Sequence, residues 1–320
     1  MENILIIAKL NRFKEQPSNN RVLLLEYLSN KKNIKLLNDS REVSLKRWIQ
    51  KTKKRINWEP TIIIYYFLSA AKEWTSIDIP DFTTSFTDIK RFMIFEDHHY
   101  SHIAIPLYKK YNFTKLIKPT KHTRSELDYH NANINFHVWG FYIDPGVFFD
   151  RQLTKKYDIL LYGFINGAYP LRAKMRAVLL HLRENLDVKI HIIEHPGYYN
   201  KGLISKLPRN EELSKLINQS RFTLVSSSHY RLLLKKYYEV PMSGSTIIGD
   251  IPPSYKDILN DKVIEIPFSA PHSEIINIIK KALQGGYQDI EANSAIWGKE
   301  LCNELSFENS YKKLCEICQN

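Results

Sequence analysis

Cysteine is scarce in this sequence. Only three of its 320 residues are cysteines, Cys302, Cys315 and Cys318, and all of them lie near the C-terminus. A disulfide framework needs more cysteines spread along the chain, so we expect a reducing, cytoplasmic compartment. Cys315 and Cys318 form a C-x-x-C pair. Zinc requires four ligands and no histidine lies in that segment, which favours two thiols on a terminal helix over a metal or redox centre.

Long hydrophobic runs are also missing. The stretches "MENILIIAKL" at the start and "TIIIYYFL" at 61–68 are too short for a signal peptide or a membrane span. Both are short and rich in β-branched and aromatic residues, which is typical of buried strands in a parallel sheet.

Acidic residues are outnumbered, 34 against 46 lysines and arginines, which gives a formal net charge of +12. An excess of this size indicates an anionic partner: nucleic acid, a membrane surface or a phosphate-bearing substrate. Charge alone does not distinguish among the three.

Strand-like and helix-like patterns alternate twice along the chain, with a change of texture around 133–151 that includes the turn Pro145-Gly146. This order predicts an α/β fold of two Rossmann-like doubly wound domains that face a central cleft, with C-terminal helices packing back. We expect an N-terminal acceptor-binding domain at 1–150, a C-terminal nucleotide-sugar-binding domain at 151–298 and a helical tail at 299–320.

The stretch "RFTLVSSSHYRLLLKKYYEVPMSGSTIIGDIPPSYKDIL" at 221–259 places one acid, Glu239, ahead of the small residues Ser243, Gly244 and Ser245 and then a strand. It resembles the nucleotide-sugar-binding core of GT-B glycosyltransferases, particularly the group-1-like branch with CgeB-type C-terminal domains. The resemblance runs from about Tyr157 through the C-terminal helices.

The resemblance implies roles for these residues. Glu239 would accept hydrogen bonds from the ribose hydroxyls of the donor, and the Ser243–Ser245 turn would offer backbone N–H groups to its phosphates. The alternatives are a surface glutamate and an ordinary helix stop at Gly244. Many retaining members carry a second acid eight positions before the ribose acid. Here that position is Arg231, which could instead offset the diphosphate charge, as could Lys235 or Lys236.

A second loop, "YGFINGAYPLR" at 162–172, follows a strand and opens a helix. Its spacing is not G-x-G-x-x-G, but Gly163 leaves backbone amides open and Arg172 presents a planar fork suited to phosphate. A simple tight turn is the alternative. After the next strand, His195 and the pair Tyr198-Tyr199 could border the nucleotide base, or His195 could be an ordinary turn residue.

In the N-terminal half, "MIFEDHHY" at 93–100 places Asp97, His98 and His99 at the end of a strand. Sugar transfer with inversion needs a base for the acceptor hydroxyl, and we expect Asp97 first, then His98 or His99. A polar strand end facing solvent is the alternative. Adjacent strand residues point to opposite faces, so a metal site here is improbable.

The segment from Ser44 to Trp58 concentrates lysines and arginines around a few apolar residues, a pattern typical of peripheral membrane contact. A solvated helix packed on the sheet is the alternative. The predicted function is metal-independent sugar transfer from a nucleotide-diphosphate donor, with no cofactor, to a glycan or lipid-linked acceptor. A polyanion or nucleic-acid-binding protein and a GT-B-type epimerase remain as rivals, although no nucleic-acid-binding motif is present.

Overall fold

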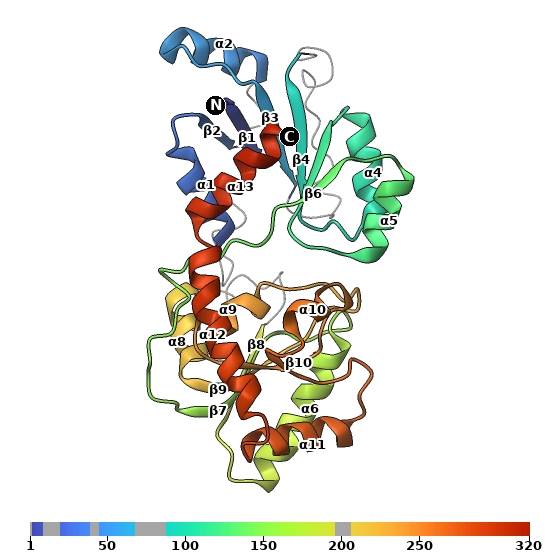
Figure 1. Ribbon diagram of the computed structural model, residues 1–320, viewed down its shortest axis with the longest axis vertical. Helices are drawn as coiled ribbons and strands as arrows, with labels where there is room; N and C mark the ends of the chain where they lie inside the picture. The colour runs from blue at the N-terminus through green and yellow to red at the C-terminus, as the bar shows by residue number, and fades with distance from the viewer. Residues whose placement is uncertain (1, 9–19, 39–44, 68–87, 196–205) are drawn as a thin grey trace. The chain divides into compact units, whose positions relative to one another are not determined.

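The computed structural model describes residues 2–8, 20–38, 45–67, 88–195 and 206–320 (Figure 1). The chain divides into two compact units. Of the described residues, the first contains 2–8, Arg21–Tyr142 and Phe307–Asn320, and the second contains Asn20 and Ile143–Ser306. The first break thus falls at 142 rather than the expected 150. The residues expected to form a separate tail from 299 onward are shared between the two units.

The first unit is built on a six-stranded parallel sheet in the order β2-β1-β3-β4-β5-β6. Its strands are β1 (Ile4–Ala8), β2 (Ile34–Asn38), β3 (Ile62–Phe67), β4 (Lys90–Phe95), β5 (Lys115–Lys118) and β6 (Phe136–Val138). All five residues of β1 and all six of β3 are buried, because helices cover both faces of the sheet.

Alternate residues of β1 point to opposite faces, and each face has its own core. Ile4 and Ile6 pack with α1 (Asn20–Ser29) and with α13 (Phe307–Gln319), the last helix of the chain. Leu5 and Ile7 pack in the core that also holds buried residues of α2 (Leu45–Ile56), α4 (Ser101–Lys110) and α5 (Thr123–Asn131). The C-terminal helix therefore completes the core of the first unit, as the sequence predicted for helices packing back.

The second unit is built on a five-stranded parallel sheet in the order β11-β10-β9-β7-β8. Its strands are β7 (Tyr157–Phe164), β8 (Ile190–His195), β9 (Ser220–Val225), β10 (Thr246–Gly249) and β11 (Val263–Glu265). Its helices are α6 (Pro170–Asn185), α8 (Asn210–Asn218), α9 (Lys236–Met242), a 3₁₀ turn (Pro253–Tyr255), α10 (Lys256–Leu259), α11 (His272–Leu283) and α12 (Gln288–Glu304).

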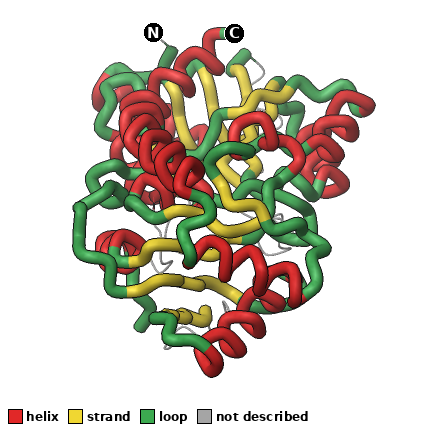
Figure 2. The backbone as a smooth tube through the Cα atoms, turned by 60° about the horizontal axis from the view of Figure 1, so that its bottom comes forward, coloured by secondary structure: helices red, strands yellow, loops and turns green. Residues whose placement is uncertain are grey.

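Helices α6 and α11 cover the sheet face to which Ile159 and Leu161 of β7 point. Helix α12 packs on α9. The two helices are so close that a Cβ on Gly298 of α12 would lie 2.1 Å from the carbonyl oxygen of Pro241 on α9. The helices and strands of both units can be followed in Figure 2. Both units are Rossmann-like, as the sequence predicted.

Candidate functional site

The strand order of the second unit marks one place where a ligand can enter. From β7 the chain continues to β8 on one side of it, and then to β9 on the other side. At such a switch point the loops that follow the two strands diverge and leave a crevice at the carboxyl ends of the strands. The loops after β7 and β9 therefore flank a candidate ligand-binding crevice.

Gly163, near the end of β7, is the point on which two cations converge. Its φ of +114° lies in the range that favours glycine. A Cβ built on Gly163 would lie 2.4 Å from Nζ of Lys236 and 3.3 Å from Nη1 of Arg172. The missing side chain is what leaves room for both cationic groups.

Arg172, in the first turn of α6, links the two diverging loops. Its guanidinium donates from Nη1 to the carbonyl of Phe164 at 2.9 Å and from Nη2 to the carbonyl of Ser226 at 3.1 Å. It also lies over the ring of Tyr169, 4.0 Å from its centroid. The side chain is 2% exposed, so its charge is fixed at the switch point and poorly solvated.

Lys236 opens α9. Its ammonium donates to the carbonyl of Tyr162 and lies 3.7 Å from the centroid of the Tyr162 ring. Burial lowers the pKa of Lys236 well below its usual value, the charge of Arg172 lowers it further, and Glu239 opposes both. Two cations held together in this way create a site where an anion would be stabilised.

Glu239 lies one helical turn after Lys236 and is 3% exposed. Burial raises the pKa of the Tyr162 hydroxyl, and the charge of Glu239 raises it further, which places the carboxylate in the same cluster. The Tyr162 hydroxyl and the Oγ of Ser226 are both buried, and neither has a hydrogen-bond partner within the described residues. A buried hydroxyl without a partner is costly, so these two groups are candidates to bind a ligand.

Sequence reasoning missed Tyr162. The only available signal was its position immediately before Gly163 in a strand that was already predicted.

An open pocket of about 270 Å³ adjoins the cluster. It lies between the ends of β7 and β8 and the start of α8, and it is mostly apolar. Burial lowers the pKa of His195, and Lys236 lowers it further, so this imidazole favours its neutral form. Tyr198 and Tyr199, expected near it, lie outside the described residues. The pocket is lined by Tyr162, Gly163, Ile193, His195, Leu207, Pro208 and Leu213.

The turn Ser243–Ser245 lies at the other end of the sheet. It precedes β10, and its groups are engaged by the protein: the Ser243 carbonyl accepts from Asn218 at 2.8 Å, and the Gly244 carbonyl from Lys155 at 2.6 Å. A Cβ on Gly244 would lie 2.6 Å from Cγ of Asp150. The structure does not bring this turn together with Gly163. We therefore leave Ser243, Gly244 and Ser245 out of the proposed site.

Arg231 lies beside the end of β10. Its Nε is 3.3 Å from Oδ2 of the buried Asp250, and its Nη2 donates to the carbonyl of Ile251 at 2.8 Å. Asp250 also accepts from the backbone N–H of Ser227 at 2.7 Å. Arg231 therefore neutralises a buried carboxylate, and Lys236 and Arg172, rather than Arg231, are the cations at Gly163.

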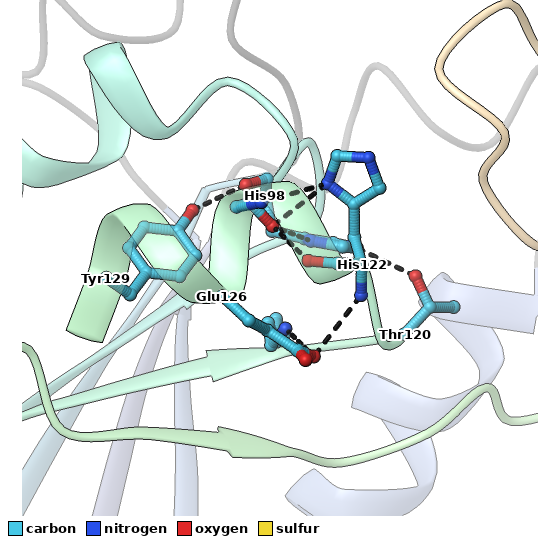
Figure 3. Close-up of polar contacts among 7 residues, drawn as sticks. His98, Thr120, His122, Glu126 and Tyr129 are labelled. Atoms are coloured by element: carbon cyan, nitrogen blue, oxygen red, sulfur yellow. Dashed lines mark hydrogen bonds and ion pairs between the residues drawn. The ribbon is translucent and has the colours of Figure 1, made fainter. Parts of the chain in front are cut away.

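In the first unit, Asp97, His98 and His99 form the turn that follows β4. His98 is 1% exposed. Its Nε2 lies 2.7 Å from Oγ1 of Thr120 and its Nδ1 lies 3.4 Å from Oγ of Ser125 (Figure 3). Burial lowers the pKa of His98 well below its usual range, with Lys118, His99 and His122 lowering it further. His98 is thus a neutral, internally bonded residue that holds the turn against the start of α5.

The acid that precedes this turn is also internally paired. Glu96 is buried and forms an ion pair with Arg21, and it accepts a hydrogen bond from Tyr142 at 2.9 Å. By contrast, Asp97 and His99 are partly exposed. Of the three expected base candidates, these two have side chains that solvent reaches.

The described residues contain neither a candidate metal centre nor a candidate membrane-spanning helix. No group of three or more histidine, cysteine, aspartate or glutamate side chains within them is placed to hold a metal ion. None of the helices in that part of the chain combines the length and the apolar character needed to cross a bilayer.

The sequence matches no family model and no curated protein. Solved structures do match. Sucrose-phosphate synthase from Thermosynechococcus elongatus superimposes with a TM-score of 0.64 at 11% identity, over 100% of this chain and 98% of that chain. HepE from Anabaena, solved in complex with UDP-glucose, gives 0.61 at 8% identity over 100% of both chains. A glycosyltransferase from Rickettsia africae gives 0.57 at 13% identity, over 98% of this chain and 97% of that chain.

At these identities the likeness establishes the fold. The narrower resemblance to the CgeB-type branch stays a prediction. Two parallel sheets in two Rossmann-like units, with C-terminal helices packing back, give this chain the GT-B fold of nucleotide-sugar-dependent glycosyltransferases.

Proposed function

We propose that the protein is a glycosyltransferase that moves a sugar from a nucleotide-diphosphate donor to a hydroxyl group of a glycan or lipid-linked acceptor. The observation that carries the proposal is the convergence of Lys236 and Arg172 on Gly163, beside Glu239, at the switch point of the second unit. Structures of the same fold have been solved with UDP and UDP-glucose, which supports a nucleotide-sugar donor.

Each residue of this cluster has a chemical task in the proposal. The cations of Lys236 and Arg172 offset the negative charge that develops on the leaving diphosphate. The Glu239 carboxylate accepts hydrogen bonds from two ribose hydroxyls, and the adjoining apolar pocket takes the flat face of the base. Because two side-chain cations serve the diphosphate, the proposed reaction needs no metal ion.

In the first unit we propose Asp97 as the base that takes the proton of the acceptor hydroxyl, with His99 as the second candidate. Both have partly exposed side chains. We assign His98 a positioning role, because both of its ring nitrogens lie next to protein hydroxyls.

A thermal-shift series tests the donor assignment. The chain is heated with millimolar UDP, GDP, CDP or dTDP, with and without EDTA. A ligand present at a hundred times its dissociation constant adds about 2.7 kcal/mol to the free energy of unfolding. We expect one nucleotide to stabilise the wild type in EDTA, and Glu239→Gln to lose most of that response.

Glu300→Gln, an exposed acid on α12, is the matched control and should respond as the wild type does. If no nucleotide stabilises the chain, the proposal fails. If a nucleotide acts only when a divalent metal is present, the metal-independent form of the proposal fails.

A further inference from the structure

Tyr162 of β7 belongs to two parts of the candidate site at once. The ammonium of Lys236 lies 3.7 Å from the centroid of its ring, so Tyr162 takes part in the cation cluster at Gly163. The same residue lines the open, mostly apolar pocket between the ends of β7 and β8 and the start of α8. Tyr162 therefore lies at the boundary between a place for an anion and a place for an apolar ring.

The Tyr162 hydroxyl is a buried donor with an unused hydrogen bond. The residue is 7% exposed, and within the described residues its hydroxyl oxygen has no hydrogen-bond partner. Burial raises the pKa of this hydroxyl and Glu239 raises it further, so the group keeps its proton and can donate it. A buried donor without an acceptor lowers the stability of a protein. Folding alone therefore does not explain why this position holds tyrosine rather than phenylalanine.

Glu239 supplies the complementary group. It is 3% exposed, it lies in the first turn of α9, and its charge acts on the Tyr162 hydroxyl. An ionised carboxylate only accepts hydrogen bonds, whereas the tyrosine hydroxyl can donate one. A ligand hydroxyl serves both, because it donates through its hydrogen and accepts through its oxygen. The pair is thus suited to a hydroxyl group of a ligand.

The covalent order of a nucleotide indicates which hydroxyl this is. Ribose joins the base to the phosphates. With the phosphates at the cations beside Gly163 and the base in the pocket, the ribose lies next to Tyr162, which belongs to both places. Of the two ribose hydroxyls, the 2′-hydroxyl is nearer to the base and therefore nearer to the pocket. This step rests on the proposed function.

We propose that the donor is a ribonucleotide, and that Tyr162 together with Glu239 selects it over its 2′-deoxy counterpart. The 2′-hydroxyl donates a hydrogen bond to the Glu239 carboxylate and accepts one from the Tyr162 hydroxyl. A 2′-deoxynucleotide cannot form either bond. A site built to hydrogen-bond a substrate hydroxyl rejects an analogue that lacks it, because buried polar groups then stay unpaired. Tyr162 is thereby a residue that determines specificity.

Calorimetric titration of the full chain with UDP, CDP and GDP, each compared with dUDP, dCDP or dGDP, tests the inference. We expect the ribonucleotide that binds to have an affinity on the order of a hundredfold higher than its 2′-deoxy form. Tyr162→Phe removes the hydroxyl and keeps the ring beside Lys236. It should weaken binding of that ribonucleotide about tenfold and leave binding of the deoxynucleotide unchanged.

The melting temperature of Tyr162→Phe without ligand separates this role from a structural one. It should be no lower than that of the wild type, because the lost hydroxyl has no partner among the described residues. Ser294→Ala, on α12, is the matched control. Ser294 is 1% exposed, and its hydroxyl also lacks a partner within that part of the chain. It is not among the residues that line the pocket, so both affinities should equal those of the wild type.

Three results would overturn the inference and leave the proposed function standing. They are equal affinities for the ribonucleotide and its deoxy form, undiminished discrimination in Tyr162→Phe, and a lower melting temperature of that variant without ligand. If none of the six nucleotides binds, the proposed function fails, and the inference fails with it.

Discussion

At the scale of single residues, the absence of a side chain at Gly163 leaves the room in which the cationic groups of Lys236 and Arg172 lie close together. Gly163→Ala would place a methyl carbon 2.4 Å from the present position of Lys236 Nζ and would force alanine to a φ of +114°. We expect the variant to lose about 1–3 kcal/mol of stability from backbone strain. Its affinity for the stabilising nucleotide should fall at least tenfold, because the ammonium of Lys236 is displaced.

Gly167→Ala is the matched control, since no atom lies within 4 Å of the position where its Cβ would be. Thermal melts with and without nucleotide measure both effects. A nucleotide response in Gly163→Ala equal to that of the control would mean that the cations do not meet the ligand at this point.

Lys236 gives donor binding a dependence on pH. Its pKa in the folded, ligand-free chain lies below the unfolded value, so the unfolded state binds more protons between the two pKa values and stability rises with pH through that window. A bound diphosphate favours the protonated ammonium. Nucleotide binding should therefore take up protons, and its affinity should fall as pH rises.

Isothermal calorimetry in two buffers of different ionisation enthalpy measures this uptake. Lys236→Met should be more stable than the wild type at neutral pH, because the folded wild type must either bury an ammonium beside Arg172 or release its proton, and methionine does neither. It should also bind nucleotide weakly and without proton uptake. A wild-type binding enthalpy that is the same in both buffers would contradict the assignment.

At the scale of elements, the direction of α9 explains where the small-residue turn lies. A helix that connects two parallel strands carries the chain from the carboxyl edge of the sheet back to its amino edge. Lys236 opens α9 at the carboxyl edge, and Ser243 follows its last residue at the amino edge. Any turn between that helix and β10 must therefore lie away from the ligand edge. The order of helix and strand in the sequence already implies this position.

Helix α13 allows a test of how far the first unit depends on the end of the chain. Leu314 is fully buried in the core shared with β1 and α1. Leu314→Ala should cost about 2–5 kcal/mol in urea unfolding, because it removes buried methyl groups and leaves a cavity. The second unit does not contain this residue, so the nucleotide-induced shift should persist.

Leu127→Ala, a leucine 60% exposed on α5, is the comparison and should change stability by no more than about 0.5 kcal/mol. If Leu314→Ala were equally mild, the packing of α13 on β1 would contribute little to the first unit.

At the scale of the whole molecule, the sequence predicted the two parallel sheets because their strands are short apolar runs at regular intervals. The loop that follows a strand and opens a helix also indicated Gly163 and Arg172 as donor-binding candidates, and the resemblance to GT-B glycosyltransferases indicated Glu239. Their donor-binding roles stay predictions. The sequence did not predict the burial of His98 or the pairing of Arg231 with Asp250. Both depend on contacts between side chains from different elements, and the period of a single element carries no information about such contacts.

The return of Phe307–Asn320 to the first unit has a consequence for biosynthesis. Domains generally fold as units during translation, with the N-terminal one first, as synthesis proceeds at about 5–20 residues per second. In this chain Leu314, Ile317 and Cys318 of the first core are made after every residue of Ile143–Ser306. The second unit can therefore finish folding before the first. Until α13 has been synthesised, the sheet of the first unit exposes the apolar face on which that helix packs.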